Sequence, residues 1–385
     1  MHILITADTV GGVWNYTREL VTGLSRHGVR VTLVSFGGVP GTEQSAWLER
    51  LPGVAYFPTD FRLEWMQGAE GKLCDSADYL LNVIREREPE LLHLSQYYYG
   101  ALNVGLPKLV VAHSDVMSWS WAVHGAEPRG SWAQSYRGLV QRGLAGASLL
   151  VAPSRWMLKC MESCYGEQQR SRVIYNGRTP ELFDPLASKL NYAASAGRLW
   201  DEGKQSQLLT ELSSPSLSVL IAGATKLKGE TAEANATSTL GVEGLIASQL
   251  APQITPQTPA TRCIGELSED GMRKLLSWAK IYIATSKYEP FGLAPLEAAF
   301  SRCAIVANDI ASLREVWGDA AIYFRSNDRE SLGEALRLLH DNQELCWDYA
   351  NRAYEHALQH YTAERMVEEY LQTYMALLER QVEAA

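Results

Sequence analysis

The sequence has 385 residues, of which 46% are hydrophobic and 21% are charged. This exceeds one ordinary core of about 100 to 200 residues, so we expect two folded domains, and the composition excludes disordered, collagen-like and simple coiled-coil proteins. Forty-four acidic and 35 basic residues give a formal charge of −9. That charge argues against a nucleic-acid-binding protein and means that an anionic ligand needs local cations.

The first half of the chain predicts βα units, because short apolar runs rich in β-branched residues alternate with helical patterns. The predicted strands span 2–6, 30–36, 91–95, 109–112, 149–152 and 173–175. The clearest helix follows the first strand, since apolar residues recur at three- to four-residue spacing from Val13 to Leu24 and Gly28 marks its end.

The second half repeats this pattern after a predicted linker at 178–191, which follows the turn dipeptide Asn176-Gly177. The predicted strands span 192–196, 218–222, 281–285, 304–307 and 321–324. Helices are expected to start at Ser312 and Asn327, because each is followed three residues later by a glutamate. The pattern of apolar residues predicts helix almost continuously from 331 to 378. In the segment 226–261 it predicts at most one helix, near 241–250.

Several patterns bear on location and metals. The first eight residues lack the basic start of a secretory signal, no apolar run is long enough to span a bilayer, and the six cysteines are scattered without CxxC pairs. We therefore expect a cytoplasmic protein without a metal site. Peripheral contact with the inner membrane face stays open, because basic and apolar residues alternate in a predicted surface helix. These residues are Arg129, Trp132, Tyr136, Arg137, Leu139 and Arg142.

Three stretches could bind an anion or carry chemistry. Gly11 and Gly12 lie where the first strand meets the first helix, so a phosphate could approach the backbone there; the pattern is not the GxGxxG of dinucleotide-binding proteins. Arg198 and Lys204 follow the first strand of the second half and suit a diphosphate.

The third stretch, 288–299, leads from a strand end through Pro and Gly into a helix. Its first amides are expected to be free for an anion or sugar hydroxyls. Glu289 and Glu297 stand eight residues apart across this turn. Such carboxylates serve either as acid and base or as hydrogen-bond acceptors for polyols, and their spacing does not choose between these roles.

The segment from Glu289 to Glu297 resembles the E-x7-E motif of retaining glycosyltransferases of family 4, which belong to the GT-B group. Further motifs stand in the family's order over essentially the whole chain. They are Gly11-Gly12, Asn176-Gly177, Gly197-Arg198 with Lys204, and Ile264-Gly265. The resemblance implies an α/β fold of GT-B type, in which two Rossmann-like domains with parallel sheets face a central cleft. Residues 1–180, with a helix at 361–385 packing back, would form the acceptor-side domain, and 190–360 the donor-binding domain.

The resemblance also implies roles for individual residues. Glu289 would accept hydrogen bonds from the donor sugar, Glu297 would bind the ribose, and Arg198 and Lys204 would neutralise the diphosphate. His113 matches a histidine near C6 of the donor sugar, although a lone histidine is more often structural. The remaining donor-binding residues would be Gly11, Gly12, Ile264, Phe291, Gly292, Leu293 and Ala294.

A front-face reaction with retained configuration follows from the same resemblance. The leaving phosphate would help to deprotonate the acceptor, so neither a protein nucleophile nor a metal is required, and the nucleotide-sugar is a co-substrate rather than a cofactor. UDP is the first donor nucleotide to expect, with GDP and ADP as alternatives, and the acceptor would be a saccharide or a glycolipid.

Aromatic residues after two strands could stack on that acceptor if their rings are exposed. One group is Tyr97, Tyr98 and Tyr99, which follow one predicted strand. The other is Trp119, Trp121 and His124, which follow the strand that ends before His113. Ordinary packing is the competing interpretation for each. Three other functions stay open: a nucleotide-sugar epimerase or hydrolase of the same fold, a non-catalytic nucleotide-sugar-binding module, and a dehydrogenase, whose dinucleotide motif is missing.

Overall fold

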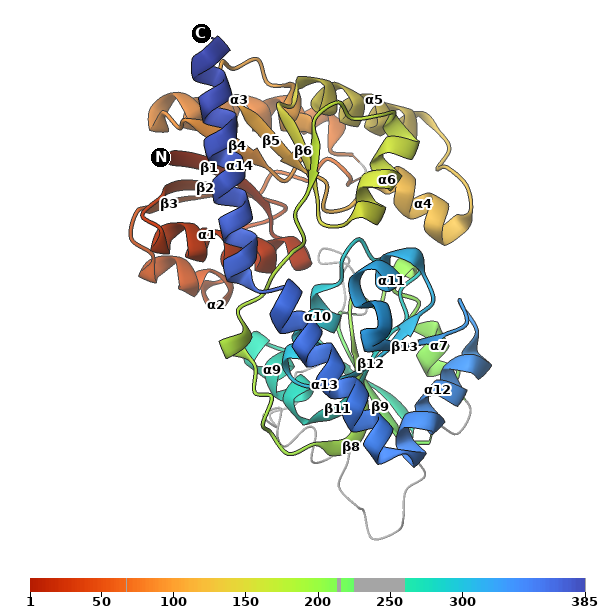
Figure 1. The fold of residues 1–385 in the computed structure, drawn as a ribbon. Coiled ribbons are helices and arrows are strands. Elements are labelled where there is room, and N and C mark those ends of the chain that lie inside the picture. The colour runs from red at the N-terminus through yellow and green to blue at the C-terminus, as the bar shows by residue number, and fades with distance from the viewer. Residues whose placement is uncertain (67, 213–215, 225–259, 385) are drawn as a thin grey trace. The chain divides into compact units, whose positions relative to one another are not determined.

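The computed structural model describes residues 1–66, 68–212, 216–224 and 260–384 and divides into two compact units (Figure 1). Unit 1 comprises Met1–Arg178 and Ala363–Ala385, and unit 2 comprises Thr179–Thr362. Each unit contains one parallel sheet covered by helices. The predicted segment 226–261, including the helix near 241–250, lies almost entirely outside the described residues.

Unit 1 contains a seven-stranded sheet in the order β3-β2-β1-β4-β5-β6-β7. The strands are β1 His2–Asp8, β2 Arg30–Phe36, β3 Val54–Pro58, β4 Leu91–Leu94, β5 Lys108–Val111, β6 Leu149–Ala152 and β7 Ser171–Val173. The helices are α1 Gly12–Arg26, α2 Thr42–Ser45, α3 Leu73–Arg87, α4 Val116–His124, α5 Ser131–Gly146, α6 Arg155–Tyr165 and α14 Ala363–Ala384. All pairs are parallel, and β1 is buried along its whole length, as expected for a strand covered on both faces.

Unit 2 contains a six-stranded parallel sheet in the order β10-β9-β8-β11-β12-β13. The strands are β8 Leu190–Ala196, β9 Ser218–Ala222, β10 Thr261–Gly265, β11 Ala279–Ala284, β12 Ala304–Asn308 and β13 Ala321–Phe324. The helices are α7 Gln207–Thr210, α9 Glu269–Trp278, α10 Leu293–Phe300, α11 Ala311–Trp317, α12 Arg329–Asp341 and α13 Gln343–His360. The prediction of two Rossmann-like parallel sheets is confirmed.

In each sheet the strand order reverses once, between β1 and β4 in unit 1 and between β8 and β11 in unit 2. Helices that follow strands on either side of such a point leave in opposite directions, so a crevice opens beyond the carboxyl ends of these strands. The loops after β1, β4, β8 and β11 are therefore the first places to look for a ligand site.

Every predicted strand overlaps an observed one, but β3 and β10 were not predicted. Both are edge strands and are only partly buried. β3 is a short apolar run that ends in Pro58, a residue that lacks the N–H group of a strand, and β10 carries the charged Arg262, so neither has the pattern of a buried central strand. The long helical run is also divided into α12, α13 and α14 by breaks at Asn342 and at Tyr361-Thr362.

The predicted N-caps at Ser312 and Asn327 are wrong. α11 starts at Ala311 after Ile310, and Ser312 is buried inside the helix. α12 is capped by Asp328, whose carboxylate accepts a hydrogen bond from the Ser331 amide at 3.0 Å. Asn327 has φ of 61° instead, and its amide donates to Asn308.

Replacing Asp328 with alanine is expected to lower the free energy of unfolding by about 1 kcal/mol, because it removes this cap. Chemical denaturation of the whole protein measures the change. Arg337→Ala, an exposed change on the same helix, is the matched control. Equal stability of the Asp328 variant and the wild type would show that the cap adds nothing.

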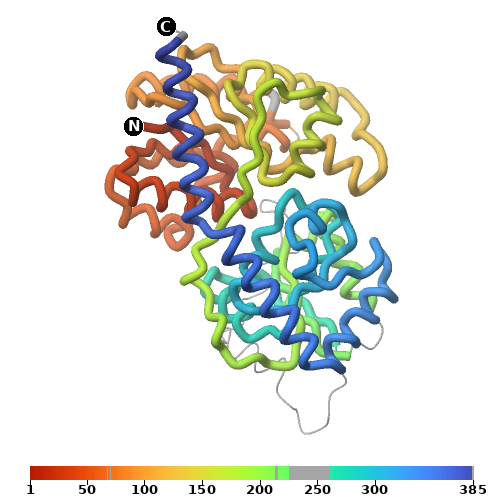
Figure 2. The backbone as a smooth tube through the Cα atoms, viewed as in Figure 1, coloured from red at the N-terminus to blue at the C-terminus, as the bar shows by residue number. Residues whose placement is uncertain are grey.

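The last helix, α14, packs against α1 within unit 1, as Figure 2 shows at the blue end of the chain. A Cβ atom at Gly23 of α1 would lie 2.4 Å from a methyl carbon of Val367, so only glycine permits this close approach. Arg178 is buried and its Nη1 lies 2.6 Å from Oε1 of Glu19 in α1. The approach of Gly23 to Val367 joins the two segments of unit 1, whereas the ion pair ties the end of the first segment back to α1.

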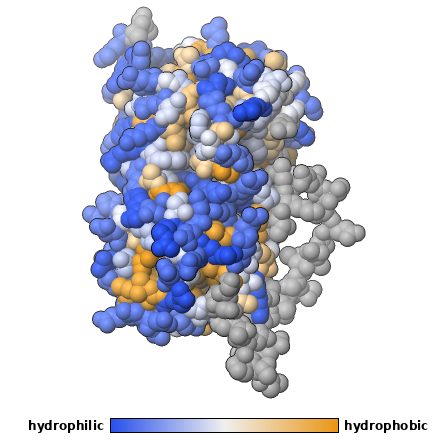
Figure 3. Space-filling view, turned by 90° about the vertical axis from the view of Figure 1, so that its right-hand side faces the viewer, coloured by the Kyte–Doolittle hydropathy of each residue, from blue (hydrophilic) through white to orange (hydrophobic). Residues whose placement is uncertain are grey.

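The possible membrane-facing surface of the arginine-rich helix gains no support from its apolar residues. Tyr136 and Leu139 in α5 are buried, and the Arg137 guanidinium pairs with Glu127 at 2.6 Å. No helix among the described residues has the length and apolar character needed to cross a bilayer. In the view of Figure 3 the surface is mostly hydrophilic, and the most apolar exposed side chains gather on part of unit 2.

Candidate functional site

The loops after β8 and β11 bring Lys204 and Glu289 together at the strand reversal of unit 2. Lys204 Nζ lies 2.6 Å from Glu289 Oε2, and Ser286 Oγ donates to the same oxygen at 2.8 Å. Their side chains retain 23% and 12% exposure, so both can reach a ligand. The sequence prediction that these two residues belong to one site agrees with this geometry.

Three polar contacts hold these loops in position. Thr285 Oγ1 donates to the Lys204 carbonyl at 2.7 Å, and the Lys287 amide donates to the Gly203 carbonyl at 2.8 Å. From β12, the buried Asn308 amide donates to the Ser286 carbonyl at 3.1 Å. The sequence prediction missed Thr285, Ser286 and Asn308, although each stands at the carboxyl end of a predicted strand.

Arg198 lies on the same loop as Lys204 but has a partner of its own. Its Nη2 is 2.7 Å from Asp201 Oδ2, and the guanidinium carbon lies 5.2 Å from the centre of the Trp200 ring. Asp201 also accepts from the Gly203 amide at 2.9 Å, so one carboxylate shapes the loop and orients the arginine. Each predicted cation of unit 2 therefore has a carboxylate beside it.

The start of α10 presents backbone donors next to Glu289. Gly292 takes φ of 95° at the N-cap, a conformation that strains other residues, and the third helical residue is Pro295, which has no N–H group. The amides of Gly292, Leu293 and Ala294 are thus the donors that the helix leaves without an intrahelical acceptor. Such a helix start favours a negatively charged or hydroxyl ligand.

The remaining predicted donor residues of unit 2 differ in accessibility. Glu297 lies in α10 and is 9% exposed. The Phe291 ring is buried and packs edge-on against Tyr361, with ring centres 5.2 Å apart, so only its backbone could meet a sugar. Ile264 lies in β10, which β9 and β8 separate from β11, so the structure does not bring it to Glu289.

Glycines join the carboxyl ends of β8, β9 and β10. A Cβ atom at Gly223 would lie 1.7 Å from the carbonyl oxygen of Gly197, and Gly223 itself donates to the Gly265 carbonyl at 2.8 Å. These contacts leave no room for side chains between the strand ends. Glycine at position 223 is therefore required for the strand ends to pack this closely.

In unit 1, Gly11, Gly12 and His113 follow strands β1 and β5 at the carboxyl edge of the sheet. Asp8 Oδ1 accepts from the Val10 amide at 2.6 Å, and Gly11 takes φ of 77° before α1 begins at Gly12. His113 Nε2 lies 3.3 Å from Ser95 Oγ. Burial lowers the pKa of His113 to about 3, so its imidazole is neutral at physiological pH.

The predicted acceptor-side aromatic residues do not share one environment. The expectation of an exposed face is wrong for Tyr97, which is buried and donates from its hydroxyl to the Ser114 carbonyl at 2.9 Å, and Tyr99 is buried too. Trp119 and His124 pack edge-to-face with ring centres 5.1 Å apart. Trp121 is 52% exposed and keeps an open ring surface.

Glu64 is a buried carboxyl group that the sequence prediction missed. It accepts hydrogen bonds from the amides of Tyr97 and Tyr98 at 2.8 and 2.7 Å, and so holds the loop after β4. Burial raises the pKa of Glu64 to about 7. No local pattern connects it with residues more than 30 positions away.

We expect Glu64 to make stability depend on pH. Between its ordinary pKa near 4.5 and the folded value of about 7, the folded state binds more protons than the unfolded state, so this group lowers the free energy of unfolding as pH rises through that window. Glu64→Gln should remove the dependence. Denaturation of both proteins from pH 4.5 to 8 measures it; a wild-type-minus-variant difference that is flat or rises with pH would contradict the assignment.

No group of three or more His, Cys, Asp or Glu side chains in the described part of the chain is placed to hold a metal ion.

Solved structures with the same architecture identify the fold. Sucrose-phosphate synthase from Thermosynechococcus elongatus matches with a TM-score of 0.76 at 15% identity, covering 99% of this chain and 100% of that one. HepE from Anabaena, in complex with UDP-glucose, matches with a TM-score of 0.71 at 17% identity, covering 98% and 100%. The two parallel sheets thus form a glycosyltransferase fold of GT-B type.

Family models give the family. Glycosyltransferase Family 4 matches residues 10–182, and Glycosyl transferases group 1 matches residues 183–356. The chain belongs to the family 4 glycosyltransferases, as the sequence motifs predicted. A curated relative, alpha-maltose-1-phosphate synthase from Mycolicibacterium smegmatis, is 23% identical over 332 residues, which cover 78% of this chain and 82% of that protein.

Proposed function

We propose that this glycosyltransferase moves a hexose from a nucleotide-diphosphate sugar to a hydroxyl group of a saccharide or lipid-linked acceptor, with retention of configuration and without a metal ion. The observation that carries the proposal is the pairing of Lys204 with Glu289 at the strand reversal of unit 2. A lysine suits a phosphate, whereas a carboxylate suits sugar hydroxyls. The pair therefore matches the two chemically different halves of a nucleotide-sugar.

The proposed reaction breaks the bond between C1 of the donor sugar and the phosphate oxygen. Negative charge grows on the departing diphosphate, and Lys204 and Arg198 would stabilise it at the moment of bond cleavage. The acceptor oxygen forms the new bond to C1 on the same face, and its proton passes to the leaving phosphate oxygen. The protein would contribute position and charge rather than a nucleophile.

The other residues would hold the donor. Glu297 would accept hydrogen bonds from the ribose hydroxyls, and the amides of Gly292 and Leu293 would bind the sugar. We propose that Gly12 and His113 of unit 1 act on the same donor, at its distal phosphate and near C6 of the sugar. A neutral imidazole suits the latter role, because it can donate or accept a hydrogen bond without adding charge.

The relatives support the choice of substrates. HepE was solved with UDP-glucose, which favours a UDP-sugar as the first donor to test. Alpha-maltose-1-phosphate synthase and sucrose-phosphate synthase carry the names of saccharide phosphates, which favours saccharide acceptors. All six cysteines are free thiols, which supports a reducing, cytoplasmic location.

A donor panel tests the proposal. Release of free nucleotide is measured from UDP-, GDP- and ADP-sugars, with and without mixed saccharide acceptors, and with EDTA present. We expect one donor whose release is stimulated by an acceptor and is unaffected by EDTA. Release that ignores every acceptor would instead support a hydrolase or an epimerase, and loss of release in EDTA would refute metal independence.

A further inference from the structure

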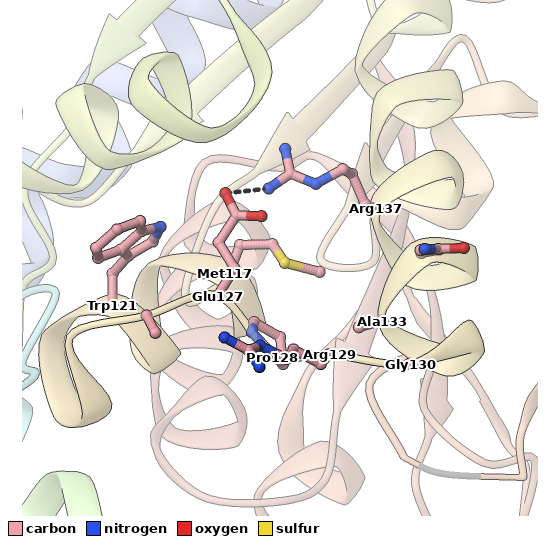
Figure 4. A pocket seen from close by; sticks show the side chains of 10 residues that line it. Met117, Trp121, Glu127, Pro128, Arg129, Gly130, Ala133 and Arg137 are labelled. Atoms are coloured by element: carbon pink, nitrogen blue, oxygen red, sulfur yellow. Dashed lines mark ion pairs between the residues drawn. The ribbon is translucent and has the colours of Figure 1, made fainter.

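A pocket of about 410 Å³ lies in unit 1, lined from α4, α5 and the loop that joins them (Figure 4). Its volume falls in the range of about 300 to 1,000 Å³ that is usual for small-molecule sites. α4 follows β5, and α5 runs from its start near this pocket back to β6. The pocket is therefore on the carboxyl-edge side of the sheet, where Gly12 and His113 also lie.

One side of the pocket is apolar. The Trp121 side chain is 52% exposed, and the buried Met117 and Ala133 line the same space. In Figure 4 the Met117 side chain extends between Trp121 and α5. An accessible indole face beside apolar side chains suits the C–H face of a pyranose ring.

The other side contains two arginines with different surroundings. Arg137 is fixed, because it pairs with Glu127 at 2.6 Å, donates to the Cys164 carbonyl at 2.6 Å and lies over the Tyr165 ring. Arg129, on the exposed loop, has no ion-pair or hydrogen-bond partner among the described residues.

The pocket lining is therefore cationic in an acidic protein. The two arginines and the single glutamate of the lining leave a formal charge of +1, whereas the whole chain carries −9. The charge of Glu127 is matched by Arg137, so the excess charge is that of Arg129. A phosphate or carboxylate group suits this guanidinium, which can bind two oxygens at once.

We propose that this pocket binds the acceptor and that the acceptor is a saccharide with an anionic substituent. Its sugar ring stacks on Trp121, and its phosphate or carboxylate pairs with Arg129. The inference rests on the proposed transferase function and specifies the class of its acceptor. It assigns Trp121 and Arg129 as the residues that select this acceptor.

Calorimetry on the full-length protein without a donor tests the pocket directly. The probes are glucose 6-phosphate, glucuronic acid, glucose and inorganic phosphate. At least one anionic saccharide should bind at least about tenfold more tightly than glucose and than phosphate, which is a difference of about 1.4 kcal/mol. The ratio between glucose 6-phosphate and glucuronic acid tells whether a phosphate or a carboxylate is preferred.

Variants assign the binding to the two residues. Arg129→Gln should remove the advantage of the anionic saccharides over glucose, whereas Arg129→Lys should keep most of it. Trp121→Ala should weaken the binding of every saccharide. Arg142→Gln, an exposed change on α5 outside the pocket lining, should change nothing. Thermal melting verifies that each variant is folded.

Three results would contradict the binding of an anionic saccharide in this pocket. Equal affinity for glucose and both anionic saccharides, unchanged binding in Arg129→Gln, or no saturable binding of either anionic saccharide up to about 10 mM would each do so. The failure of the proposed function is a separate result, because it appears as absence of acceptor-stimulated nucleotide release. Transfer to neutral saccharides with an unchanged acceptor KM in Arg129→Gln would refute the pocket and leave the transferase standing.

Discussion

Replacing Lys204 with alanine is expected to lower kcat by about 10²- to 10³-fold, because it removes a cation from the place where negative charge grows on the leaving diphosphate. Lys204 Nζ is held 2.6 Å from Glu289 and its loop is tied to the loop after β11, so the charge is already in position. Preorganised charge of this kind acts on the transition state more than on substrate binding.

Steady-state kinetics with the active donor measures the effect. Lys204→Arg should recover part of the rate, since it restores the charge but not the compact geometry. Lys274→Ala, on the exposed face of α9, is a control that should leave kcat unchanged. An unchanged kcat/KM in Lys204→Ala would remove Lys204 from the site.

Glu297→Gln is expected to weaken nucleotide binding by about 1 to 3 kcal/mol, which corresponds to roughly 5- to 150-fold in Kd. The change keeps the size of this buried side chain but replaces a carboxylate that could accept two ribose hydrogen bonds by an amide with one acceptor oxygen. The effect should be the same for the free nucleotide and for the nucleotide-sugar, because both carry the ribose.

Glu289→Gln is the matched comparison for this experiment. Glu289 is assigned to the sugar, so its variant should lose affinity for UDP-glucose and keep its affinity for UDP. Calorimetric titration of both ligands into both variants separates the two roles. Equal UDP affinity in the wild type and Glu297→Gln would show that this carboxylate has a structural role.

The sequence was sufficient for the fold class and for the central pair of unit 2. Buried strands carry continuous apolar runs, and the residues that follow two such strands meet at the carboxyl edge of a parallel sheet. Lys204 and Glu289 obey this rule over a separation of 85 positions. Motifs that stand at strand ends can therefore be placed in space before a structure exists.

Long-range burial was the part that the sequence did not reveal. Tyr97 is one of three consecutive tyrosines in the sequence. In the structure its amide donates a hydrogen bond to Glu64, and its hydroxyl donates one to a carbonyl after β5. Asn308 looks like an ordinary strand end, yet it connects the loops that start at Thr285 and at Asn327. The partners in these contacts lie far apart in the sequence and follow no helical or strand periodicity, so a local sequence pattern does not reveal them.

Product analysis of one reaction distinguishes glycosyl transfer with retention from hydrolysis and from inversion. The protein is incubated with the donor that shows acceptor-stimulated release, together with its acceptor, and the product is examined by mass spectrometry and proton NMR. We expect an acceptor enlarged by one hexose, linked in the same anomeric configuration that the sugar had in the donor. Free hexose with no enlarged acceptor would contradict glycosyl transfer, and an inverted linkage would contradict the front-face reaction built around Lys204 and Glu289.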